Sequence, residues 1–153
     1  MNKKSIVIIL VFIILLLIIG FMAFNQFNYS QNQIKIEDVT LVLPEGFHEG
    51  TPNKEGHTNI TNGYDTLFIK KCGSDNINKY TKQFVKDKQK ENASAHIKKL
   101  NIGDKEYYKG SITNKTNIAR YWFDYNGEVY LIYSWTANKN TDKIVTDIIS
   151  SLN

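Results

Sequence analysis

An unbroken run of apolar or small residues, from Ile6 through Phe24, most constrains how this chain can fold. As a helix, these 19 residues would extend about 28 Å, which matches the hydrocarbon thickness of a bilayer. Lys3 and Lys4 precede the run, and the positive-inside bias places such residues in the cytoplasm. The sequence therefore predicts a cytoplasmic stub over 1–5, a transmembrane anchor over 6–24 and an extracytoplasmic remainder.

A cleaved signal peptide is the alternative interpretation of this segment. Its apolar core would usually span about 7–15 residues and end in a small-x-small cleavage site. Here the core is longer, and Phe21 stands where cleavage after Ala23 would need a small residue. No cysteine follows the segment, so the cleavage and acylation of a lipoprotein are not expected. We therefore expect an uncleaved anchor in a cell membrane, with the carboxyl-terminal domain outside the cell.

The charge balance of the outer part is close to neutral. Without Lys3 and Lys4, 17 of the 19 basic residues remain against 15 acidic ones, which gives little reason to expect a nucleic acid partner. The segment from Lys70 to Lys115 nevertheless holds 12 lysines and five acidic residues. Such a segment beside a membrane could meet an anionic lipid or wall polymer, or it could be a solvated helix face. The abundance of isoleucine, lysine and asparagine suggests a bacterial source with an AT-rich genome.

Cys72 is the only cysteine, so no disulfide bond within the chain can stabilise the outer domain. A lone thiol outside the cell could be buried, free or paired with another chain, and the strand-like run before Cys72 favours burial. The order His57, Cys72, Arg120 resembles that of sortase-type transpeptidases. However, two lysines precede Cys72, and the Thr-x-Thr-Cys-like string of that family is missing. A thiol enzyme at Cys72 is therefore a remote alternative.

The outer part reads as a polar stalk over 25–35 followed by one folded domain over 36–153. β-Branched, aromatic and alternating patterns predict strands over residues 39–43, 57–60, 64–71, 95–102, 106–113, 117–125 and 128–136. Asn62-Gly63 and Asn126-Gly127 separate two pairs of these strands, and Asn-Gly suits the positive backbone angles of a two-residue hairpin turn. Residues 47–54 are expected to form an irregular loop.

Two amphipathic helices are also predicted. Ser74-Asp75-Asn76 offers capping side chains, and apolar residues then recur on one helical face from Ile77 to Val85. Thr141 can cap a second helix, whose apolar stripe runs from Ile144 to Leu152. With hairpin turns dominating, the order of elements predicts an α+β fold, a largely antiparallel sheet with packed helices, preceded by one transmembrane helix.

Four short strings carry a family resemblance: residues 39–47 (VTLVLPEGF), 102–108 (IGDKEYY), 120–123 with 129–133 (RYWF and VYLIY), and 144–152. They resemble the opening strand and turn, the central hairpin, the late hairpin and the closing helix of the PsbP-like superfamily. That family is an α-β-α sandwich around an antiparallel sheet. The resemblance implies a non-catalytic binding or accessory module, and it transfers no functional residue because the family has no shared site. The polar segment from His48 to Asn59 departs from the family pattern.

The histidines give little support for a metal site. His48, His57 and His96 are scattered and lack the spacing of a helical zinc site. Glu49 and Glu55 lie beside the first two and could join them as loop ligands, but four polar residues in such a loop are more often solvated. We therefore expect no metal and no cofactor.

Other catalytic signatures are missing from the sequence. It contains no serine-hydrolase elbow, phosphate-cradling glycine loop or dinucleotide fingerprint. Glu37 and Asp38 are adjacent, and on an extended chain their side chains would point to opposite faces, so they are not expected to act as an acid/base pair. The chain is therefore not expected to be an enzyme.

Two sets of residues are candidates for binding. Aromatic residues are dense from Tyr107 to Trp135, and Trp122, Tyr130 and Tyr133 could form an exposed surface of the kind found at interfaces. The alternative is that these rings fill the core of a small sheet. The basic candidates are Lys82, Lys86 and Lys90, which belong to the polar face of the first predicted helix.

These observations favour a membrane-anchored accessory protein of a bacterial envelope. Its outer domain would engage another envelope protein and perform no chemistry of its own. The alternative is a module that binds an anionic wall polymer or lipid through the lysines between Lys70 and Lys115. Salt distinguishes the two, because polymer binding by lysines weakens steeply with ionic strength and an apolar protein interface persists.

Overall fold

The computed structural model describes residues 11–22 and 32–152. The chain divides into two units, Met1–Gln33 and Ile34–Asn153. In the first, residues 11–22 form a helix with exposed side chains. No helix within the described ranges has both the length and the apolar character needed to cross a membrane. The predicted stub over 1–5 lies outside the described residues, as do parts of the predicted anchor over 6–24 and stalk over 25–35.

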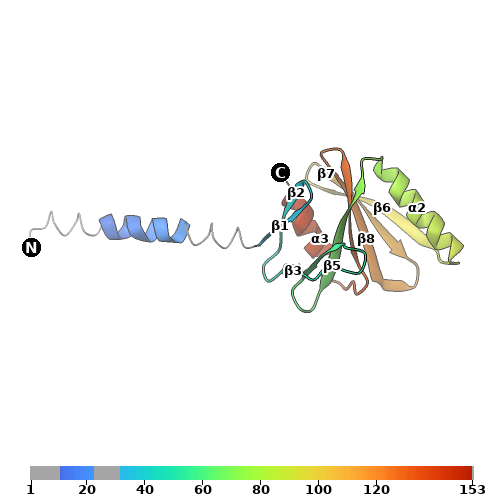
Figure 1. Ribbon diagram of the computed structural model, residues 1–153, viewed down its shortest axis with the longest axis horizontal. Coiled ribbons are helices and arrows are strands. Elements are labelled where there is room, and N and C mark those ends of the chain that lie inside the picture. Colours follow the sequence, from blue (N-terminus) through green and yellow to red (C-terminus); the bar gives the residue numbers. More distant parts are fainter. Residues whose placement is uncertain (1–10, 23–31, 153) are drawn as a thin grey trace, which may run out of the picture. The chain divides into compact units, whose positions relative to one another are not determined.

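The second unit is built around a seven-stranded antiparallel sheet with the order β3-β4-β5-β9-β8-β7-β6 (Figure 1). Its strands are β3 (His48–Gly50), β4 (Thr58–Thr61), β5 (Thr66–Gly73), β6 (Ala95–Ile102), β7 (Lys105–Ile112), β8 (Lys115–Tyr125) and β9 (Glu128–Ser134). A separate hairpin joins β1 (Gln33–Ile36) and β2 (Val39–Val42), and the helices are α2 (Ile77–Lys90) and α3 (Thr141–Ser150). The predicted α+β fold with an antiparallel sheet is confirmed.

The turn between β8 and β9 has the geometry predicted for it. Tyr125 pairs with Glu128, so Asn126 and Gly127 form a two-residue turn with φ angles of 54° and 78°. The turn at Asn62 differs, because Thr61 pairs with Thr66 and the loop holds four residues. There the Asn62 side chain accepts hydrogen bonds from the backbone N–H groups of Tyr64 and Asp65, at 2.9 and 2.7 Å.

Regular structure begins earlier than predicted. β1 starts at Gln33, within the segment predicted as a stalk, and Glu37 and Asp38 form its turn into β2. Because Glu37 adopts a φ of 50° rather than an extended conformation, the two carboxylates do not diverge. Lys71 Nζ lies 3.3 Å from Glu37 and 3.2 Å from Asp38, so the expectation of opposite faces is wrong.

Helices cover the sheet on both faces, which gives three layers (Figure 1). Successive residues of a strand point to opposite faces, so Tyr121 and Phe123 belong to one core and Trp122 to the other. The first core also contains the apolar stripe of α3 and the β1–β2 hairpin. The second contains Phe84 of α2. Two cores on opposite faces leave little of the sheet exposed to solvent.

Local capping determines where the helices begin. The Asn76 side chain accepts a hydrogen bond from the backbone N–H of Asn78 at 2.9 Å, so the predicted cap of α2 is confirmed. The predicted cap of α3 is wrong. Its N-cap residue is Asn140, and the Thr141 hydroxyl accepts from the backbone N–H of Asn138 at 2.8 Å instead.

Candidate functional site

The aromatic residues that were candidates for an exposed surface lie in the core. Trp122, Tyr130 and Tyr133 expose only 3%, 1% and 4% of their surface. Trp122 and Tyr133 pack beneath α2, and Tyr130 packs on the α3 side. Since both faces of the sheet are covered, these rings cannot form a binding surface, and the alternative that they fill the core is confirmed.

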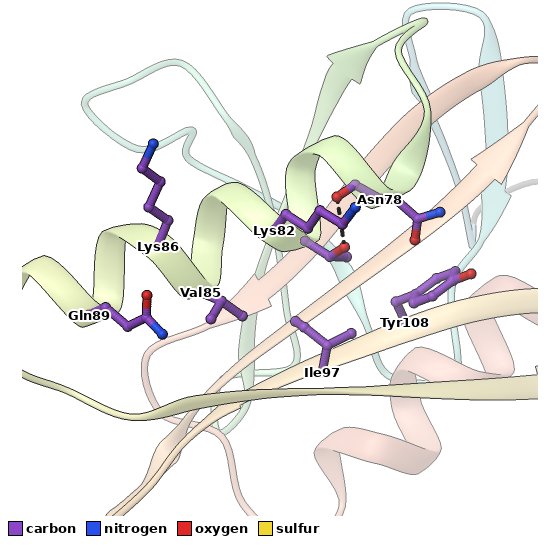
Figure 2. A pocket seen from close by; sticks show the side chains of 8 residues that line it. Asn78, Lys82, Val85, Lys86, Gln89, Ile97 and Tyr108 are labelled. Atoms are coloured by element: carbon purple, nitrogen blue, oxygen red, sulfur yellow. Dashed lines mark hydrogen bonds between the residues drawn. The ribbon is translucent and has the colours of Figure 1, made fainter.

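A surface groove lies where α2 crosses β6 and β7. This groove has a volume of about 630 Å³ and is lined by Asn78, Thr81, Lys82, Val85, Lys86, Gln89, Ile97 and Tyr108. Figure 2 shows Val85 on the helix, with Ile97 and Tyr108 on the strands below it. These three half-buried side chains form an apolar floor. The exposed lysines form the rim, where Lys86 extends away from the strands (Figure 2).

The rim lysines differ from the other lysines of α2 in forming no ion pair with any residue that the structure describes. Lys79, Lys88 and Lys90 form ion pairs with Asp75, Glu91 and Asp87, at 2.6, 2.7 and 3.3 Å. Within the described part of the chain, neither Lys82 nor Lys86 has a carboxylate at ion-pair distance. Of the three predicted basic candidates, the structure thus places Lys82 and Lys86 on the groove. Lys90 lies outside its lining.

A short polar network closes the strand side of the groove. The Tyr108 hydroxyl donates to Glu106 Oε1 at 2.5 Å, and this hydrogen bond raises the pKa of the phenol. Lys99 also pairs with Glu106, and Lys99 and Tyr108 together lower the pKa of that carboxyl group. Glu106 is therefore already engaged and does not compensate the charge of the rim lysines.

The groove is suited to binding rather than to catalysis. Its lining contains no carboxylate, histidine or thiol. The one buried hydroxyl in it, that of Thr81, donates to the carbonyl oxygen of Asn78 at 3.2 Å. What the groove offers is apolar contact area beside two lysines that form no ion pair with the residues that the structure describes. Apolar area beside positive charge is complementary to a surface that is partly apolar and negatively charged.

Cys72 and His57, the residues of the thiol-enzyme alternative, lie in surroundings that do not favour a nucleophilic thiol. Cys72 is half-buried, and burial raises the pKa of its thiol, which disfavours the thiolate that a nucleophile needs. His57 Nδ1 lies 2.7 Å from the Tyr133 hydroxyl and 3.4 Å from Glu55. Across residues 11–22 and 32–152, no group of three or more metal-ligating side chains lies close enough to hold an ion.

Sequence reasoning missed the floor of the groove. Val85 follows Phe84 in α2, and the sequence pattern placed both on one apolar face of the helix. Adjacent helical positions diverge by about 100°, so an apolar stripe that includes both residues is wider than one line of contact. Phe84 occupies the core and is 8% exposed. Val85 lies at the border of the contact, where it meets Ile97 in the groove. The width of the apolar stripe was therefore the sequence signal that could have indicated an apolar surface beside the core contact.

Fold and groove together define an α+β sandwich domain with a lysine-rimmed surface groove. No protein-family model and no curated protein matches the chain. Among solved structures, it is similar to the solution structure of cyanobacterial PsbP (CyanoP) from Synechocystis sp. PCC 6803, with a TM-score of 0.48 and 11% identity. The match covers 74% of this chain and 85% of that one.

Proposed function

We propose that this chain is a non-catalytic accessory protein of a bacterial envelope, anchored by residues 6–24, whose outer domain binds another envelope protein through the α2 groove. The observation that supports this most is the pair of unpartnered lysines, Lys82 and Lys86, beside the apolar floor. The occupant is an acidic segment of the partner that also carries apolar side chains. The apolar side chains would cover Val85 and Ile97, and the acidic ones would meet the lysines.

A limited acidic segment fits this site better than a long polyanion. Only two lysines of α2 form no ion pair in the described structure, and the other three pair with carboxylates. A polymer that binds by charge needs a longer row of free cations. The half-buried floor also provides apolar area that a polyphosphate would leave uncovered. An anionic wall polymer or lipid therefore remains the second candidate.

Removing the two rim charges tests this proposal. The double variant Lys82→Gln/Lys86→Gln in the full-length chain should bind the partner about tenfold more weakly, since each rim charge contributes modestly to association. The partner is first identified by crosslinking in intact native cells and mass spectrometry. Affinity for the purified partner is then measured by surface plasmon resonance at several salt concentrations.

The matched control is Lys79→Gln/Lys90→Gln, which removes the same charge from the same helix. Both of those lysines pair with carboxylates, so this variant should keep nearly the wild-type affinity. An equal loss in both variants, with a steep salt dependence, would mean that binding depends on the overall charge of α2 and not on the groove. Recovery of only lipid or wall polymer in the crosslinking step would replace the protein partner by an anionic polymer or lipid. Unchanged binding by the Lys82/Lys86 variant would exclude the groove.

The proposed topology has its own test. Protease added to intact cells should remove an epitope tag fused after residue 153, because residues 36–153 would lie outside the membrane. The measurement is an immunoblot for the tag, beside a cytoplasmic protein that must survive in the same cells. A tag that resists digestion in intact cells but is lost from lysed cells would contradict the outward orientation.

A further inference from the structure

Arg120 is the only arginine in the sequence, and it lies among three aromatic rings. Its guanidinium carbon is 5.5 Å from the ring centre of Phe84, 5.3 Å from that of Tyr133 and 5.1 Å from that of Trp135. Cation–π contacts of this kind attract the guanidinium to the ring faces. They fix the position of the charge without using any of its hydrogen-bond donors.

Those donors have no acceptor in the part of the chain that the structure describes. Arg120 is half-buried, it forms no ion pair among residues 11–22 and 32–152, and its buried Nε has no hydrogen-bond partner. Arginines so enclosed are normally paired with carboxylate or carbonyl oxygens, because the guanidinium carries five N–H donors. The cluster thus holds a positioned cation that has no carboxylate at ion-pair distance among the described residues.

The cluster also opens to solvent through an aromatic side chain. Trp135 is 48% exposed, although most large apolar residues of the domain are buried. Its ring meets Tyr133 edge-on, with the centroids 5.9 Å apart. The Tyr133 hydroxyl is held in turn by Asn53 Nδ2 at 2.9 Å and by His57 at 2.7 Å. An exposed indole beside a fixed guanidinium offers apolar and charged contact together.

The surrounding charges favour a ligand with a single negative charge. Glu55 and Glu91 lie close enough to act electrostatically on Arg120. Both would repel a dianion such as phosphate more strongly than a monoanion. A carboxylate also matches the planar fork of the guanidinium, which can donate two parallel hydrogen bonds to it.

We propose that Arg120 and Trp135 form a second binding site, for a carboxylate joined to an apolar or aromatic group. The site is distinct from the α2 groove, since Arg120 pairs with Tyr133 between β8 and β9, whereas the groove lies over β6 and β7. It does not depend on the proposed function of that groove. The carboxylate could belong to a small aromatic acid or to the carboxyl terminus of a peptide.

Nuclear magnetic resonance of the full-length ¹⁵N-labelled chain in a non-ionic detergent tests this site. Because the sequence has one arginine, the Nε–Hε signal reports Arg120 alone. Sodium benzoate should shift this signal and the indole N–H signal of Trp135 in a saturable way, and sodium chloride at equal ionic strength should not. Equal shifts with chloride, or no saturable shift with any carboxylate, would overturn the proposal.

A second experiment asks whether the carboxylate belongs to a small aromatic acid or to a peptide terminus. It uses a peptide that ends in phenylalanine, with either a free or an amidated carboxyl terminus. Binding of the free form but not the amidated form, with benzoate inactive, supports a peptide terminus. Binding of benzoate alone supports a small aromatic acid. Failure of benzoate and of both peptides would overturn the site.

Substitutions distinguish a binding residue from a packing residue. Arg120→Met keeps an apolar side chain of similar length and should weaken benzoate binding about tenfold, judged by the Trp135 signal. Lys115→Met removes one charge from the same strand and should leave binding unchanged. If Arg120→Met does not fold, Trp135→Ala alters a half-exposed residue and should also weaken binding several-fold, judged by the Arg120 signal. Wild-type affinity in a folded Arg120→Met variant, or in Trp135→Ala, would overturn the proposal.

Discussion

Replacing Trp122 with alanine should lower the free energy of unfolding by about 3–5 kcal/mol, the range measured for large aromatic residues in cores. Trp122 is 3% exposed, and its ring lies 5.3 Å from that of Phe84, so it joins α2 to the sheet. Gly110 of β7 lies against both of these rings. A Cβ atom there would come within 2.7 Å of Trp122 and 2.9 Å of Phe84, which shows how closely the layers pack. Urea unfolding of the full-length chain in detergent, followed by circular dichroism, measures the loss.

Tyr64→Ala is the matched control for this prediction. Tyr64 is also aromatic but 94% exposed, so its removal should change stability by no more than about 0.5 kcal/mol. A Trp122→Ala variant as stable as Tyr64→Ala would place Trp122 on the surface and revive it as a binding residue. A loss of several kcal/mol in Trp122→Ala alone would agree with its place in the core beneath α2.

Much of the fold could be predicted because its signals are local. The Asn126-Gly127 turn needs positive φ at both positions, and few other residue pairs provide it at low cost. Asn76 caps α2 with its own side chain. The apolar stripe of α3 likewise became its buried face. Each of these features depends on residues within one or two turns of chain, so the sequence alone reveals them.

The short strands lacked such a signal. β3 pairs with β4 at the edge of the sheet, but its three residues are polar or glycine and none is buried. A strand is recognised by alternating side chains, and β3 is held by backbone pairing. In β1, Ile34 and Ile36 do alternate and are buried. Polar residues surround them, so this segment was predicted as a stalk, and only its partner β2 was predicted as a strand.

The orientation of the aromatic residues depends on tertiary structure. Period two separates Trp122 from Tyr121 and Phe123, but it does not say whether the second face is covered. The second face is covered by α2, and β6 and β7 separate this helix from β8 along the chain. Gly110 was the one hint, because a residue without a side chain in an aromatic strand often marks a close approach of another element.

The free lysines of the groove were within reach of sequence reasoning. On a helix, charged residues pair at spacings of three or four. Lys79 and Lys90 have an acidic residue at such a spacing, whereas Lys82 and Lys86 have none on either side. The contribution of Ile97 and Tyr108 to the floor was not predictable, because it depends on how α2 lies over β6 and β7.

Replacing Ile148 with alanine, in the core between α3 and the sheet, should lower the free energy of unfolding by about 2–5 kcal/mol. Ile148 of α3 is fully buried, in the core that also contains Leu41 of the β1–β2 hairpin and Ile132 of the sheet. Truncating it removes transfer free energy and leaves a cavity that the helix and hairpin can only partly fill. The midpoint of urea unfolding should fall accordingly, with little change in the slope.

Lys143→Ala, on the same helix, is the control for Ile148→Ala. The Lys143 side chain is 79% exposed and forms one ion pair with Asp147, so its loss should cost no more than about 0.5 kcal/mol.

A double variant of Ile148→Ala and Trp122→Ala then tests whether the two cores are independent. Their residues lie on opposite faces of the sheet, so the two losses should add to within about 0.5 kcal/mol. A clear departure from additivity would mean that the sheet transmits repacking from one face to the other. The α2 groove would then depend on α3 for its shape.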